Sequence, residues 1–288
     1  MFDLRRIIWL ASYPKSGNTW VRSLLAHYFM PPGQAPDINN LRRFTTADVR
    51  QDFYDLAAGR PFIGSSIEDW LKVRPEALRL IAKSKQGKHF VKTHCSPIIV
   101  QNTHIILPEV TAGAIYVLRN PFDVVPSFAR HTSASIDDAI ERMCNTETFM
   151  GTDTGIYDIL GRWDDHITRW TSAPGLPIHV VRYEDLLGKP AQAMQDLLKF
   201  LSIKPESPKI ARAVKATRFE TMKKQEEKDG FHERPAHMES FFTRGKAGGW
   251  RDDLTPAQVG RIRDEFAPVL QKYYPELLKE TESYAASG

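Results

Sequence analysis

Apolar residues along the chain fall into short continuous runs that alternate with longer stretches of helical spacing. The continuous runs cover residues 7–11, 89–93, 114–119 and 178–183. Between them, apolar residues recur at helical intervals in stretches 17–29, 121–130 and 191–203. Near-continuous apolar strands separated by helices predict a parallel sheet that is covered on both faces. The predicted fold class is therefore α/β, with a central parallel sheet flanked by helices on both faces.

Three less regular stretches carry Pro, Gly and mixed charge. They span residues 31–75, 132–154 and 225–249, and they are interpreted as loops or lids over a site. No internal repeat or shift in composition marks a boundary, so residues 1–288 are expected to form a single domain. The last residues, from about 280 to 288, are expected to fray.

Composition excludes some classes of function. The chain has 288 residues, 42% of them hydrophobic, and its net charge of +4 is too small to indicate nucleic-acid binding. Cys95 and Cys144, its only cysteines, form neither a disulfide framework nor a metal-binding spacing, which favours a reducing, cytoplasmic setting. No apolar run has the length of a membrane span or a signal sequence.

The first strand leads into the sequence YPKSGNTW, residues 13–20. Gly17 permits a sharp turn after which backbone N–H groups point at a bound anion. Lys15 adds charge, while Ser16, Asn18 and Thr19 add donors. The loop lacks the GxxxxGK[ST] pattern of common nucleotide hydrolases. From these residues alone, an ordinary strand-to-helix turn with a surface lysine is an equal alternative.

Two further segments place polar residues after predicted strands. In YVLRNPFDVVPSFARH, residues 116–131, Arg119 and Ser127 could grip one phosphate, Arg as a fork and Ser as a donor. The alternative is an Arg–Asp pair that caps a helix. In FVKTHCSP, residues 90–97, His94 stands two residues after Lys92. Its imidazole is matched to neutral pH for accepting a hydroxyl proton.

These segments resemble the motifs of cytosolic-type sulfotransferases, which use 3′-phosphoadenosine 5′-phosphosulfate (PAPS). The family's usual loop is YPKSGTTW, so Asn18 replaces a Thr, and KTHLP is matched with Cys95 in place of Leu. The third pattern is RNPxDxxxSxxxH. The resemblance implies a P-loop-like sheet whose loop, Lys15 to Thr19, holds the phosphosulfate, while Arg119 and Ser127 hold the 3′-phosphate.

Three more segments resemble the family's adenine and 3′-phosphate contacts. By this resemblance Trp20 stacks on adenine, Tyr183 of VVRYEDLLGKP reaches its pocket, and in ATRFETMKK Thr217 bonds the ring edge while Phe219 faces Trp20. TRGKAGGWRDDLT resembles RKGxxGDWKxxFT and implies contacts from Arg244 and Gly245. Here Thr243 replaces Arg, Arg244 replaces Lys and Gly249 replaces Asp. Binding of the 3′-phosphate is then weakened, or Lys246 compensates.

The implied activity is in-line transfer of a sulfuryl group from PAPS to a hydroxyl or amine of a small-molecule acceptor, leaving 3′-phosphoadenosine 5′-phosphate (PAP). His94 is then the general base, Lys15 stabilises the bridging oxygen, and Lys92 lies near the sulfuryl group. No metal is required. Two rivals are a P-loop-type nucleotide kinase or hydrolase, for which the missing GK[ST] is unfavourable, and a non-catalytic nucleotide-binding module, in which Lys15 and His94 would be idle.

The sequence leaves the acceptor open. Apolar walls could come from the aromatic residues of the irregular stretches, namely Phe44, Phe53, Tyr54, Trp70, Phe149, Phe231 and Phe241. A cationic acceptor could instead be received by Asp48, Asp52, Glu68 or Asp69. The expected partners are thus a small-molecule acceptor, no nucleic acid and no membrane span, and homodimer formation is left open.

Overall fold

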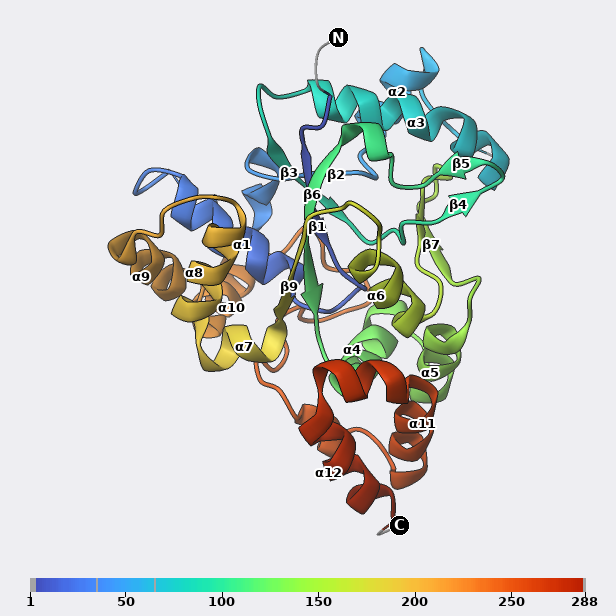
Figure 1. The fold of residues 1–288 in the computed structure, drawn as a ribbon, viewed down its shortest axis with the longest axis vertical. Coiled ribbons are helices and arrows are strands. Elements are labelled where there is room, and N and C mark those ends of the chain that lie inside the picture. The colour runs from blue at the N-terminus through green and yellow to red at the C-terminus, as the bar shows by residue number, and fades with distance from the viewer. Residues whose placement is uncertain (1–3, 35, 65, 287–288) are drawn as a thin grey trace.

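The computed structural model describes residues 4–34, 36–64 and 66–286. Its centre is a five-stranded sheet in the order β2 (Thr46–Ala47), β3 (His89–Thr93), β1 (Ile7–Ala11), β6 (Thr111–Leu118) and β9 (Ile178–Arg182) (Figure 1). Every neighbouring pair is parallel. Ala11 pairs with both Thr93 and Tyr116, so β1, β3 and β6 end at the same edge. The predicted parallel α/β sheet is confirmed.

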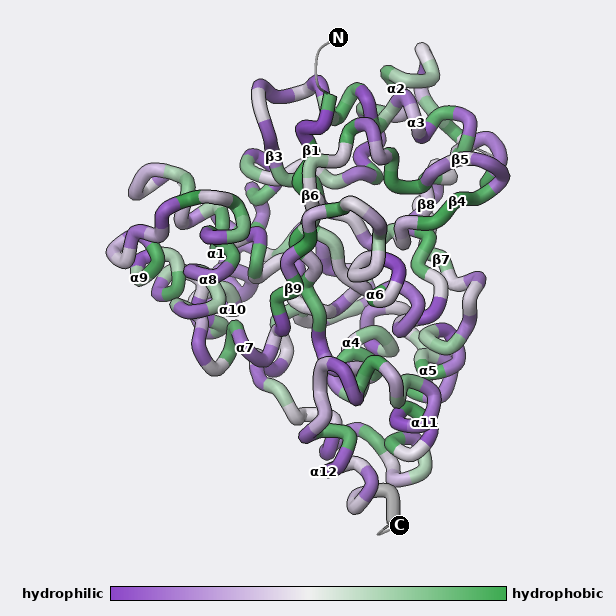
Figure 2. Tube along the Cα trace, viewed as in Figure 1, coloured by the Kyte–Doolittle hydropathy of each residue, from purple (hydrophilic) through white to green (hydrophobic). Residues whose placement is uncertain are grey.

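Alternate side chains of β1 enter two separate cores. Trp9 packs with Tyr116 in the larger core, which α3, α4, α6 and α11 cover. Leu10 packs with Ile115 in the second core, under α1, α8 and α9. Hydropathy follows this arrangement (Figure 2). Strands β6 and β9 are mostly hydrophobic, while hydrophobic and hydrophilic residues alternate along the outer helices α9 and α11. The sheet is thus flanked by helices on both faces, as predicted.

Helices connect and surround the strands. In chain order they are α1 (Asn18–Phe29), η1 (Ile38–Arg43), α2 (Gln51–Ala58), α3 (Ile67–Lys83), η2 (Pro108–Val110), α4 (Pro121–Thr132), α5 (Ile136–Cys144), α6 (Trp163–Thr171), α7 (Tyr183–Gly188), α8 (Pro190–Phe200), α9 (Ser207–Ala216), α10 (Phe219–Asp229), η3 (Gly249–Asp252), α11 (Pro256–Tyr273) and α12 (Pro275–Ala286). Two small hairpins join β4 (Ile99–Val100) to β5 (Thr103–His104) and β7 (Phe149–Gly151) to β8 (Tyr157–Ile159).

The structure corrects the expected loops. Stretch 31–75 contains η1, α2 and the start of α3, and stretch 132–154 contains α5. Only the stretch between α10 and η3 is irregular over most of its length. Residues 280–286 belong to α12 and residues 287–288 lie outside the described part of the chain, so fraying of the tail stays a prediction.

Two further observations bear on the sequence-based expectations. Both Cys95 and Cys144 are free thiols. Among the residues that the structure describes, no helix has the length and apolar character needed to cross a membrane.

Candidate active site

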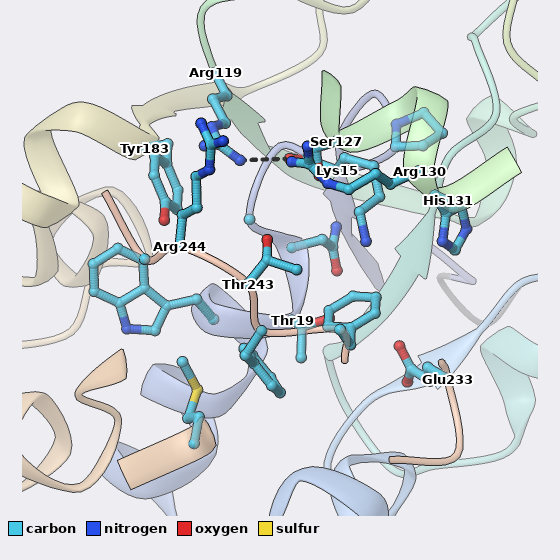
Figure 3. Close-up of a pocket in the computed structure, with 18 of the residues that line it drawn as sticks. Lys15, Thr19, Arg119, Ser127, Arg130, His131, Tyr183, Glu233, Thr243 and Arg244 are labelled. Atoms are coloured by element: carbon cyan, nitrogen blue, oxygen red, sulfur yellow. Dashed lines mark hydrogen bonds between the residues drawn. The ribbon is translucent and has the colours of Figure 1, made fainter. Parts of the chain in front are cut away.

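A cavity of about 280 Å³ opens at the edge where the parallel strands end. Arg119, Tyr183 and Arg244 lie on one side of it, and Lys15, Arg130, His131 and Glu233 lie on the other (Figure 3). The predicted site residues that line it are Lys15, Gly17, Asn18, Thr19, Trp20, Lys92, His94, Arg119, Ser127, Tyr183, Phe219, Arg244 and Gly245. Segments far apart in the sequence therefore converge on one site.

Gly17 shapes the loop between β1 and α1. Its φ of 101° lies in the left-handed region, and a Cβ there would be 2.7 Å from Cδ2 of Tyr183. Asn18 does not offer its amide hydrogens to a ligand, because its Nδ2 donates to the Leu10 carbonyl oxygen at 2.9 Å and to Ser12 Oγ at 3.3 Å. Ser16 is buried and does not line the cavity. No described side chain caps α1; the Trp20 N–H donates to the Gly17 carbonyl oxygen at 3.0 Å, which leaves the N–H groups of Asn18 and Thr19 for a ligand.

Lys15 presents a buried ammonium group to the cavity. Its Nζ lies 3.6 Å from the centroid of the Phe241 ring and has no hydrogen-bond partner among the described residues. Burial, together with the charges of Arg119, Lys92 and Arg130, lowers the pKa of Lys15 to about 7. A buried cation without a partner is costly, and a bound anion would remove that cost.

Arg119 directly follows β6 and faces the same cavity. Its guanidinium lies 4.3 Å from the centroid of the Tyr183 ring, and its Nη1 donates to the Lys15 carbonyl oxygen at 3.3 Å (Figure 3). The Nε of Arg119 is buried and has no partner in the described part of the chain. Ser127 lies two turns into α4 and lines the cavity as well. Arg119 and Ser127 thus line the same cavity.

His94 follows the last residue of β3, and its ring orientation is set by Ser12. Because a carbonyl oxygen only accepts, the 2.8 Å contact with the Ser12 carbonyl oxygen means that Nδ1 carries the proton. The lone pair of Nε2 is then free. Burial is the first cause that lowers the pKa of His94 well below its usual value, and Lys92 is the second. The imidazole is thus neutral and able to accept a proton.

Aromatic side chains form the opposite end of the cavity. Trp20 makes an edge contact with Tyr183, with ring centroids 5.5 Å apart. Gly245 has a φ of 60° and lies against the Phe219 ring, where a Cβ would clash. Thr217, by contrast, is fully buried, donates its hydroxyl to the Ala213 carbonyl oxygen at 2.9 Å, and does not line the cavity. The structure therefore does not bring Thr217 to the predicted adenine site.

Residues 243–246, which depart from the family's usual pattern, differ in whether they reach the cavity. Lys246 does not line the cavity, and its Nζ lies 3.9 Å from an Asp252 oxygen on the surface. Arg244 does line the cavity, and its Nη2 contacts Asp253 at 2.6 Å. Asp253 also contacts Nη1 of Arg130 at 3.3 Å. Lys246 thus lies outside the cavity, while Arg244 and Arg130 both line it and contact the carboxylate of Asp253.

Sequence reasoning missed four titratable residues among those described as lining the cavity, namely Arg130, His131, Asp158 and Glu233. The first two belong to the quoted segment 116–131, so a signal existed for them. Asp158 lies on β8, where burial raises its pKa to about 6. Glu233 lies in the irregular segment after α10, and no local motif surrounds it.

Most of the residues considered for the acceptor lie elsewhere. Of the seven aromatic residues, only Phe241 lines the cavity. Tyr54 and Trp70 are fully buried in the larger core. None of the four acidic residues considered lines it either. Asp48, for example, is buried and bound by the guanidinium of Arg74 at 2.7 Å.

One group of potential metal ligands lies beside the cavity. Oxygen and sulfur atoms of Asp48, Cys95 and Asp158 lie within 4.8 Å of one another. The Arg74 guanidinium already supplies a cation to this group, and Thr93 donates to the same Asp48 oxygen at 2.8 Å. The cluster is therefore accounted for by bonds within the protein.

Comparison with known proteins is consistent with this geometry. A family model described as "Sulfotransferase domain" matches residues 5–280. "Sulfotransferase 1A1" of Canis lupus familiaris is 24% identical over 274 residues, which cover 91% of this chain and 82% of the relative. "Cytosolic sulfotransferase 10" of Arabidopsis thaliana is 22% identical over 275 residues, which cover 88% of this chain and 74% of the relative. The fold is similar to that of mouse sulfotransferase SULT7A1 complexed with PAP, with a TM-score of 0.61, 18% identity, and coverage of 99% and 90%.

Proposed function

This chain belongs to the sulfotransferase domain family, and we propose that it transfers the sulfuryl group of PAPS to a hydroxyl or amine of a small polar acceptor. The observation that carries the proposal is that the buried ammonium of Lys15, without a hydrogen-bond partner among the described residues, shares one cavity with the imidazole of His94. Residues 1–288 act as one catalytic domain, and a cytoplasmic setting fits the names of the relatives. A nucleotide kinase or hydrolase is not favoured, because the family match covers nearly the whole chain.

The residues present fit PAPS as the donor substrate. Lys15 and the uncapped start of α1 would hold the phosphosulfate. Arg119 and Ser127 would hold the 3′-phosphate, supported by Arg244 and Arg130. Trp20, Tyr183 and Phe219 would enclose the adenine, since aromatic faces suit a purine. The buried Nε of Arg119 and Nε1 of Trp20, neither with a described partner, are donors that this ligand could satisfy.

The chain's own groups divide the chemistry between them. His94 accepts the acceptor's proton at Nε2 as the acceptor atom bonds to sulfur. Lys15 stabilises the negative charge that develops on the bridging oxygen while the sulfur–oxygen bond to the nucleotide breaks. Lys92 is the next-to-last residue of β3 and lines the cavity, where it would stabilise the sulfuryl oxygens. No proton transfer other than that to His94 is needed.

The acceptor end of the cavity indicates a polar molecule. Lys92 and His131 lie near enough to act on His94 electrostatically, and Asp158, Glu233 and the apolar Met150 line the same cavity. A flat aromatic or steroid acceptor would leave the buried Nδ1 of His131, which has no partner in the described part of the chain, without a hydrogen bond, which is unfavourable. We therefore expect a screen with PAPS to give faster turnover with amino alcohols and sugars than with simple phenols. Faster turnover with phenols would contradict the proposed acceptor class but not sulfuryl transfer.

Arg119→Ala is expected to weaken binding of PAP by about 1.5–3 kcal/mol, because charge-assisted hydrogen bonds to the 3′-phosphate are lost. Binding of 5′-AMP, which lacks that phosphate, should change much less. Calorimetry with both nucleotides measures the difference. Lys246→Ala is the matched control and should leave both affinities unchanged, since its Nζ lies at the surface beside Asp252. An equal loss for both nucleotides would place Arg119 elsewhere on the ligand.

A further inference from the structure

A carboxylate in an anion-binding cavity requires an explanation, and Glu233 is such a carboxylate. It lies in the segment between α10 and η3, and it lines the cavity beside Lys15 and Lys92. A negative charge there opposes the binding of a phosphosulfate. Unless it has a role, its presence costs affinity for the donor.

Glu233 is held by two cations from the sheet and the first helix. Arg22 Nη1 contacts its two carboxylate oxygens at 2.8 and 2.9 Å. Lys92 Nζ lies 3.9 Å from Oε2. Arg22 is buried, and its Nε also donates to Thr45 Oγ1 at 3.0 Å, so the guanidinium is fixed. The carboxylate is therefore positioned by a fixed partner on α1, although its own segment has no regular secondary structure.

The charges around Lys15 show what this placement achieves. Arg119, Lys92 and Arg130 come from three different elements, and all disfavour the charged form of Lys15. Glu233 is the group that opposes them and raises the pKa of Lys15. Burial alone would raise the pKa of Glu233 itself, but Lys92, Arg22 and Lys15 outweigh burial and lower it.

We propose that Glu233 is a positioning residue whose carboxylate is the internal counter-ion of the cavity, holding Lys92 in place and keeping Lys15 charged for the donor. The inference rests on the proposed use of PAPS. When the donor binds, its own negative charge takes over this role at Lys15, and Arg22 retains Glu233. The cost in anion affinity is then offset by a charged lysine at neutral pH.

The test is the pH dependence of PAP affinity in wild-type protein and in Glu233→Gln, measured by calorimetry from about pH 6 to about pH 8.5. The Gln oxygen can still accept from Arg22, so the charge is removed while the contact is kept. At the acid end the variant should bind PAP as tightly as wild type, or tighter. Toward the alkaline end it should bind about three- to tenfold more weakly, because less Lys15 is charged.

Two controls separate charge from structure. Glu233→Asp keeps the charge and should follow the wild-type pH dependence. Glu239→Gln removes a charge from the same segment outside the cavity. Its PAP affinity should stay equal to that of wild type at every pH. A Glu233→Gln to wild-type affinity ratio that is constant with pH would show a merely structural contact and overturn the inference. A wild-type protein that does not bind PAP would instead contradict the proposed function. An NMR titration of Lys15 gives the same answer directly if binding is too weak to measure.

Discussion

Replacing His94 by alanine is expected to lower turnover by about 10²–10⁴-fold, which is the usual contribution of a general base. The fold and the nucleotide affinity should change little, because His94 contacts Ser12 and faces the acceptor side of the cavity. Steady-state kinetics with a responsive acceptor, a PAP titration and a thermal melt measure the three quantities separately.

The pH profile adds a second check on His94. Because burial and Lys92 hold the pKa of His94 well below its usual value, the imidazole stays neutral through the neutral range. Protonation of His94 should therefore lower wild-type turnover only on the acid side of that range, and any loss on the alkaline side belongs to Lys15. His104→Ala, an exposed histidine outside the cavity, is the matched control and should keep full turnover. Near-wild-type turnover of His94→Ala with several acceptors would give His94 a structural role.

The parts of the fold that could be predicted are those where one local pattern decides the structure. β1 and β6 are buried over most of their length, so their sequences are almost continuously apolar, while β3 and β9 are partly buried and retain a shorter apolar pattern. β2 has only two residues, Thr46 and Ala47, and its strand pairing with β3 leaves no pattern to detect. Pairing of so short a segment is decided by tertiary contacts.

Proline and charge misled the interpretation of the irregular stretches. The sequence pattern predicts Pro75 as the end of an irregular stretch, but it lies inside α3. The helix persists because Leu71, Leu78 and Ile81 bury one face in the larger core, which outweighs the lost hydrogen bond. The same core holds Tyr54 and Trp70, so aromatic residues that suggested acceptor walls are in fact packing residues.

In the cavity, too, the residues that could be predicted are those next to strands with a clear local pattern. Lys15, Arg119 and His94 each lie at the end of a buried strand, so the sequence order already brings them to one edge. Glu233 comes from an irregular segment, and its partner Arg22 is 211 residues away in the sequence. No local pattern encodes such a pair. The acceptor side of the site, which depends on pairs of this kind, could therefore not be predicted.

Lys15→Met should lower turnover by about 10²–10³-fold, comparable to removing one preorganised donor to a developing oxyanion. The side chain is matched in length, so packing against Phe241 can persist while the charge is lost. Single-turnover kinetics at saturating PAPS separates this effect on chemistry from weaker binding.

Lys15 should also determine how nucleotide affinity depends on pH. Its pKa in the free protein is about 7, lowered first by burial and then by Arg119, Lys92 and Arg130. A phosphosulfate or phosphate binds the ammonium form, so affinity for PAP is highest when Lys15 is charged and falls as the pH rises above about 7. At the alkaline limit the loss approaches about tenfold per pH unit. In Lys15→Met this alkaline loss should disappear, leaving weak binding at every pH, because the remaining guanidinium groups do not titrate in this range. An alkaline loss that persists in Lys15→Met would assign it to another group and remove Lys15 from the role of charged phosphosulfate ligand.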